Sequence, residues 1–341
     1  MTAKVDFKYL NAELYRHPGE RGARDRLEKV PGFGKAMDML TDNSGIKAER
    51  QAEVASMARV GPGVYPVLND LWNDIQSLFG LNGIPLHIAC DSPASCSLRG
   101  GNDHPSLVLD ARLLDTLAEN EMSALLAIQA GTVRLGNATL MAASDFMRWF
   151  MDFYGIAGAP AVLPAWGLEN WRRYASFSAD RAAALALGNP EGVVALLARM
   201  AGAGEKAWGG IVKPDDLRVQ GLEALSHQSD WSSSRVRRFA LAMNRQNNVA
   251  LIRRLDLLDW FAGGAPARIL AGEMTEPEGA KRDFGAEAAG EKAADPSLAY
   301  WGEFAGDADS EADGGGTCPM AELKGMAEKG LNSFIKAGEA F

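Results

Sequence analysis

The chain has 341 residues, of which 47% are hydrophobic and 23% are charged. This is the balance of a soluble, mostly helical protein with room for a sizeable core, and it excludes a fibrous or fully disordered chain. The net charge of -9 comes from one segment, because residues 1–270 hold 29 basic and 29 acidic side chains whereas residues 273–316 hold 3 and 12; a neutral body gives no electrostatic reason to expect nucleic-acid binding.

The first third of the chain predicts short helices, one stronger helix and a small sheet. Residues 1–65 read as a wrapping layer of helices broken at His17-Pro18-Gly19 and at residues 31–34. After Pro66, large apolar residues recur at the three-and-four spacing of one helix face as far as Gly80. Residues 85–90 and 106–109 then read as two strands of a hairpin, the only β structure that the pattern predicts.

The rest of the body predicts helices. One begins at Asn120-Glu121 and continues to Met141, and a second covers about residues 169–186. Further helices are expected after Pro190, at residues 217–225 and at residues 249–261. The predicted fold class is therefore mainly α with a small β sheet (α+β).

The compartment follows from cysteines and from apolar stretches. Three cysteines, Cys90, Cys96 and Cys318, are an odd number, and no apolar signal core follows the first charged residues. These features predict a cytoplasmic protein. The apolar stretch 149–168 contains an aspartate, glycines and prolines, so a spanning helix is not predicted there. It is expected to be a lid buried on the protein's own core, with contact to a membrane surface as the alternative.

The C-terminal part changes character. Residues 273–316 are rich in Ala, Gly, Glu and Asp and predict a disordered, acidic low-complexity linker. Residues 317–341 predict an amphipathic helix, which either docks on the chain's own body or binds a partner.

Two stretches resemble a known family. Residues 113–121 with 125–136, and Trp171 to Ala182, are similar to the two motif helices of the HtpX-like zinc metallopeptidases, gluzincin-type relatives of the CAAX prenyl endopeptidases. The resemblance covers roughly residues 15–272. It implies a zincin-like metallopeptidase fold within a single peptidase-type domain at residues 1–272.

The residues at the family's catalytic positions do not suit its chemistry. Such a site needs two histidines at i and i+4 on one helix, a glutamate beside the first as general base, and a third ligand from a second helix. By the resemblance these positions are Ile128 and Thr132, Gln129, and Ser176. Isoleucine has no donor atom, hydroxyls are weak zinc ligands, and glutamine accepts no proton at neutral pH. The sequence therefore predicts a lost zinc site, no cofactor, and no peptidase activity from these residues.

Other positions match the family in a structural role. Asp180, Arg181 and Arg253 fall on its second-helix carboxylate, the arginine beside it and a characteristic arginine further on. A pairing that ties helices together is the expected role for these charges.

Rival sites have weaker signals. His87, Cys90, Cys96 and His104 could in principle gather around zinc, but their spacing matches no common finger, and His87 and Cys90 would point to opposite faces of a strand. No His-Asp partner is identifiable for a serine nucleophile among Ser92, Ser95 and Ser178. The segments Gly61-Pro62-Gly63 and Gly314-Gly315-Gly316 lack the Lys-Ser/Thr of a phosphate loop.

Three functions stay open from the sequence. The first is a degenerate metallopeptidase homologue that binds an extended polypeptide, or acts as a scaffold, by adding a strand beside the 85–109 hairpin. The second is an active metalloendopeptidase with a non-standard metal site, for which His17, His87, His104 and His227 are the available imidazoles. The third is an interaction protein that works through its acidic tail and C-terminal helix.

Overall fold

The computed structural model describes residues 5–29, 33, 37, 55–90, 96–145, 162–202, 216–223 and 250–275. The predicted C-terminal helix, nearly all of the predicted acidic linker, and most of the apolar stretch at 149–168 lie outside these residues. The described chain is mainly helical with one small sheet, which confirms the α+β class.

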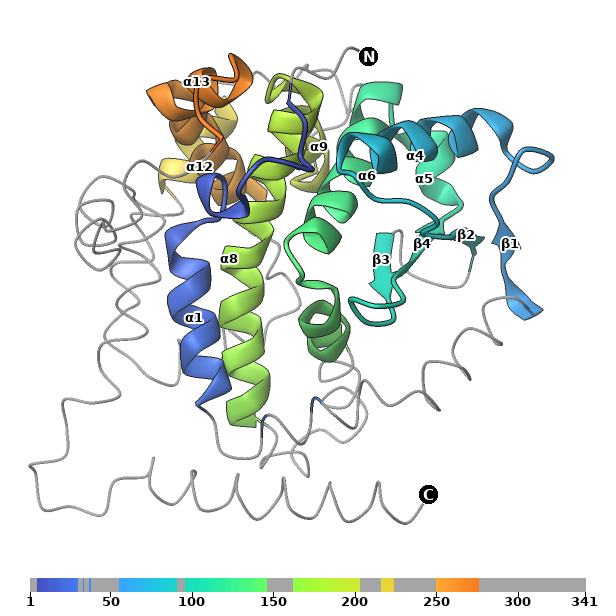
Figure 1. Ribbon diagram of the computed structural model, residues 1–341, viewed down its shortest axis with the longest axis horizontal. Helices are drawn as coiled ribbons and strands as arrows, with labels where there is room; N and C mark the ends of the chain where they lie inside the picture. The colour runs from blue at the N-terminus through green and yellow to red at the C-terminus, as the bar shows by residue number, and fades with distance from the viewer. Residues whose placement is uncertain are drawn as a thin grey trace, which may run out of the picture.

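Helices account for most of the described fold (Figure 1). Helices α1 and α8 run side by side, α6 lies next to α8, and the sheet lies on the far side of α6 (Figure 1). The helices in chain order are η1 (Ala12–Leu14), α1 (Pro18–Glu28), α4 (Pro66–Leu78), α5 (Arg112–Thr116), α6 (Glu119–Arg134), α8 (Val162–Leu187), α9 (Glu191–Met200), α12 (Ala250–Ala262) and α13 (Gly264–Leu270).

The sheet corrects the predicted hairpin. It has four strands in the order β1-β2-β4-β3, namely β1 (Ala58–Arg59), β2 (Leu86–Ala89), β4 (Ser106–Asp110) and β3 (Cys96–Arg99). The two predicted strands, β2 and β4, are parallel neighbours, whereas β3 pairs antiparallel with β4. The hairpin is therefore β3–β4, and β3 forms one edge of the sheet that the described residues build. Strand β3 was missed because its segment is short and carries polar residues.

Helix boundaries differ from the prediction at three places. Helix α6 stops at Arg134, because Gly136 adopts a left-handed φ of +72° and a separate helical segment follows at residues 138–145. Helix α8 begins at Val162 rather than near 169. Its Pro164 lies in the first turn, where a missing N–H costs no helical hydrogen bond. Helix α13 was not predicted.

The core consists of two apolar clusters. One joins α4, the sheet, α6, α8 and α9, and the other joins α1, α8 and the 138–145 segment. Helix α4 also holds the chain just before β2, because Trp72 Nε1 donates to the Ile84 carbonyl at 2.8 Å and Gln76 Oε1 accepts from the Ile84 N–H at 2.8 Å. None of the described helices is both long enough and apolar enough to cross a membrane.

Candidate functional site

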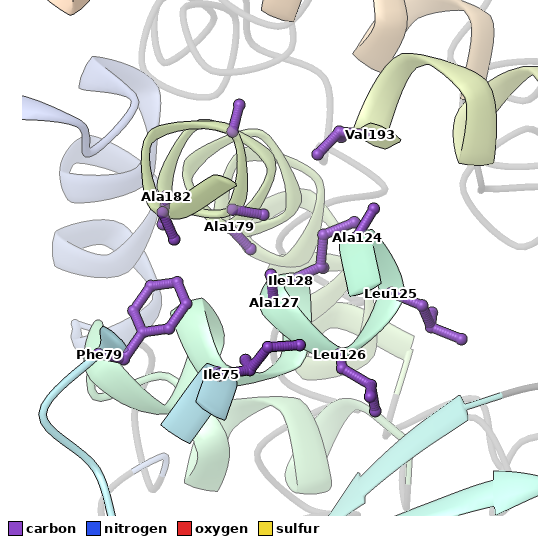
Figure 2. Close-up of a cluster of buried hydrophobic side chains, with 14 of the residues drawn as sticks. Ile75, Phe79, Ala124, Leu125, Leu126, Ala127, Ile128, Ala179, Ala182 and Val193 are labelled. Atoms are coloured by element: carbon purple, nitrogen blue, oxygen red, sulfur yellow. The ribbon is translucent and has the colours of Figure 1, made fainter. Parts of the chain in front are cut away.

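The positions that the resemblance assigns to a zinc site lie on α6 and α8, two helices that pack on each other. Ile128 is buried in the larger apolar cluster, which also includes alanines of both helices. Figure 2 shows Ile128 among Ala124 and Ala127 of α6, with Ala179 of α8 close by. The helices approach so closely here that a Cβ added to Gly131 would lie 2.9 Å from the Ala182 Cβ. The contact is aliphatic on both sides.

The polar residues at the same positions hydrogen bond within their own helices. The Thr132 hydroxyl is buried and donates to the Ile128 carbonyl at 2.9 Å. The Ser176 hydroxyl donates to the Arg172 carbonyl at 2.9 Å. Gln129 is half-buried on α6. No imidazole, thiol or carboxylate is contributed by these four positions, so the donor set does not fit zinc.

The charged residues that the sequence singled out form two reciprocal ion pairs between α8 and α12. Arg253 donates to Asp180 with Nε–Oδ2 and Nη2–Oδ1 distances of 2.8 and 2.6 Å. Arg181 donates to Asp256 at 3.2 and 2.9 Å in the same two-bond manner. All four residues are buried. Burial raises the pKa of the Asp180 carboxyl, and the Arg253 guanidinium opposes that rise.

A second polar cluster adjoins this pair of bridges at the start of α1. The His17 ring is fully buried, stacks on Tyr174 at 5.2 Å between centroids, and places Nε2 3.5 Å from Asp256 Oδ1. Its Nδ1 accepts from the Gly19 N–H at 3.1 Å, which caps α1. The Ser178 hydroxyl accepts from the His17 main-chain N–H at 2.8 Å and donates to the Glu20 carboxylate.

This arrangement bears on the serine-nucleophile alternative. Ser178 does lie near a histidine and an aspartate, which the sequence alone did not reveal. However, its hydroxyl contacts the main chain of His17 rather than the imidazole, and it is fully buried. A nucleophile needs its hydroxyl on the imidazole and open to substrate. Ser178 is therefore a structural residue of the cluster.

Sequence reasoning missed three members of this polar cluster. Glu20, Asn137 and Asp256 are buried, and Asn137 Nδ2 donates to Glu20 Oε1 at 2.8 Å. A signal was present for Asp256, because it lies one helical turn after Arg253 on the same helix. For Glu20 only its ion pair with Arg16, four residues earlier, had a local signal, because its other partners Asn137 and Ser178 come from distant parts of the chain.

The rival metal ligands are distributed over several elements. His17 caps α1, His87 is buried in β2, His104 is exposed before β4, and His227 lies outside the described residues. Burial raises the pKa of the Cys96 thiol to about 12, which disfavours the thiolate that a metal needs. Within the described ranges, no group of three or more His, Cys, Asp or Glu side chains could hold a metal ion.

The chain is similar to a metallopeptidase. It is 26% identical over 217 residues to "Plastoglobule-localized metallopeptidase 48, chloroplastic" of Arabidopsis thaliana, a match that covers 58% of this chain and 58% of that protein. No protein-family model matches the chain, and no solved structure matches it significantly. The chain thus spans less than two thirds of this relative's length, and the cytoplasmic location stays a prediction. The match supports a relationship between this chain and the metallopeptidases.

Proposed function

We propose that this protein is a catalytically degenerate, HtpX-like metallopeptidase homologue that acts as a polypeptide-binding or scaffolding module. One observation carries the first half of the proposal. At the α6–α8 contact, where zinc chemistry requires two imidazoles and a carboxylate base, the chain has a buried isoleucine and two hydroxyls bonded to their own helices. These residues offer no ligand set that could hold a zinc ion.

The loss affects both requirements of the reaction. Zinc binding fails for want of ligands, and Gln129 in the base position cannot take a proton from water at neutral pH. Removing a general base alone costs roughly two to four orders of magnitude in rate. Both losses would have to be reversed together to recover hydrolysis.

The binding half of the proposal rests on the edge strand β3. It pairs with β4 from Cys96 to Arg99 on one side, and in the sheet that the described residues form no strand follows it on the other. An edge strand offers alternate main-chain N–H and C=O groups to an added extended peptide. This mode of recognition needs no metal and no catalytic side chain.

The test of the catalytic half measures zinc and hydrolysis on the same preparation. Protein purified without chelator is assayed for bound zinc by mass spectrometry, then for zinc uptake, and then for cleavage of denatured casein. We expect no stoichiometric zinc and no chelator-sensitive cleavage. One tightly held zinc per chain with chelator-sensitive cleavage overturns the proposal in favour of an active metalloendopeptidase.

The binding half is tested with proline substitutions in β3. Neighbouring residues of an edge strand direct their N–H groups to opposite sides of the strand. Of the two variants Ser97→Pro and Leu98→Pro, one therefore removes an N–H that points to β4, and the other, called the outward variant, removes an N–H on the open side. We expect the outward variant to keep the fold but lose binding to unfolded casein. Unchanged binding in a folded outward variant contradicts strand addition at β3, and loss of binding only on deleting residues 276–341 favours the tail instead.

A further inference from the structure

The loop between β1 and α4, together with the first two residues of α4, forms an exposed run without a formal charge. Residues 62–67, Pro-Gly-Val-Tyr-Pro-Val, are all exposed, with Val64, Tyr65 and Val67 exposed by 47%, 43% and 81%. Three large apolar side chains within four residues are unusual on a protein surface without a partner. Figure 1 shows this loop at the outer end of the sheet side, away from the α1–α8 helices.

The loop is held rigidly rather than left loose. Gly61 and Val64 exchange two main-chain hydrogen bonds of 2.9 Å, which close a tight turn around Pro62-Gly63. Tyr65 follows with φ of 58° and ψ of 57°, and its carbonyl accepts the first helical bond of α4 from Asn69 at 2.9 Å. A non-glycine residue in the left-handed region is strained, and such strain is kept where it serves a site.

We propose that residues 62–67, here called the apolar tip, insert into a lipid surface. The tip carries only three large apolar side chains, far fewer than the roughly 20–30 residues a side that a specific protein interface typically uses. Lipid insertion needs no such area, because each apolar side chain that enters contributes separately. The tip carries a tyrosine, a residue enriched at membrane interfaces, with an apolar ring and a polar hydroxyl.

The charges around the apolar tip favour a neutral lipid surface. Among the described residues, exposed Arg59 precedes it, and exposed Asp70 and Asp74 follow it on α4. Two carboxylates against one guanidinium give anionic headgroups no net attraction for the tip. We therefore assign the tip to a zwitterionic surface, for which phosphatidylcholine vesicles are the probe.

The test is flotation of the full chain with phosphatidylcholine vesicles at low and at high salt. We expect co-flotation that salt does not weaken, because burial of apolar groups is not screened. Val67→Ser should reduce the partition coefficient about tenfold. Val219→Ser is the matched control, since Val219 is a similarly exposed valine at 64% in the distant 216–223 segment. Protein that stays in solution at every lipid concentration, or equal loss in both variants, overturns the proposal.

A second variant separates structural from binding effects. Tyr65→Gly relieves the left-handed strain while removing the ring, so we expect a higher unfolding midpoint together with weaker flotation. A purely structural role for Tyr65 would leave flotation unchanged. If Val67→Ser instead abolishes capture of a defined protein partner while vesicles never bind, the apolar tip is a protein contact and the lipid assignment is wrong.

Discussion

The reciprocal ion pairs between α8 and α12 allow a quantitative prediction about stability. Asp180→Ala removes the carboxylate that makes two hydrogen bonds to the buried Arg253 guanidinium. The two side chains are 0% and 9% exposed, so water screens neither charge, and the pair makes two charge-assisted bonds of 2.8 and 2.6 Å. Breaking one partner of such a pair costs about 3–5 kcal/mol of unfolding free energy. We expect the lower end, because Asp256 lies one turn away from Arg253 on α12.

The double variant Asp180→Leu with Arg253→Met tests the reasoning. It removes both charges and keeps the volume, so it should unfold closer to the original protein than either single variant does. Urea denaturation followed by circular dichroism gives the unfolding free energies of Asp180→Leu, of Arg253→Met and of the double variant, provided that the slope with urea is unchanged. A cost below about 1 kcal/mol for Asp180→Ala, or additive costs in the double variant, would refute the claim that this buried pair acts as a unit.

Four further substitutions and one labelling experiment probe other points of the fold. Gly19→Ala should lower the unfolding free energy by about 1–3 kcal/mol, because its Cβ would lie 2.3 Å from an aromatic carbon of Tyr174 on α8. Gly22→Ala on the same helix meets nothing nearer than 3.7 Å, so thermal unfolding should show a gain in stability of about 1 kcal/mol. Gln76→Leu should lower the unfolding free energy in urea by about 1–3 kcal/mol, since the buried Ile84 N–H loses the side-chain oxygen that accepts its hydrogen bond. Iodoacetamide at mildly alkaline pH should label exposed Cys90 well before Cys96, whose pKa burial raises to about 12, and equal rates by peptide mass spectrometry would contradict this. The same raised pKa predicts stability that falls as pH rises from about 9 towards 12, and Cys96→Ala should weaken that fall.

The helices were predictable where one face is apolar. The stripe after Pro66 identified α4, and the residues after Pro190 identified α9, because period-3.6 patterns are local. The partner of each strand was not predictable. Parallel pairing of β2 with β4 depends on where the intervening β3 places itself, and sequence periodicity carries no information about that order.

The candidate site divides in the same way. The identities of Ile128, Gln129, Thr132 and Ser176 could be assigned by resemblance, and the chemistry of each side chain follows from its type. Two findings come from the structure alone. The two hydroxyls bond to their own helices, and Ile128 joins an aliphatic contact between α6 and α8. The polar cluster around Glu20 was not predictable beyond its local pair with Arg16, because its contacts with Asn137 and Ser178 join residues that are more than a hundred positions apart.

These long sequence separations have a consequence for synthesis on the ribosome. Helix α1 is synthesised early, but Ser178, which accepts from the main-chain N–H of His17 at its start, follows 161 residues later. Asp180 and Arg181 of α8 pair with residues of α12 that lie a further 73 and 75 positions along the chain. Until α12 is made, a nascent chain therefore carries Asp180 and Arg181 without the groups that neutralise them. Such non-local closure slows folding and exposes unpaired surface to other chains. A chain interrupted after α9 therefore already contains the α8 residues that contact α1, but it lacks Arg253 and Asp256, which pair with Asp180 and Arg181.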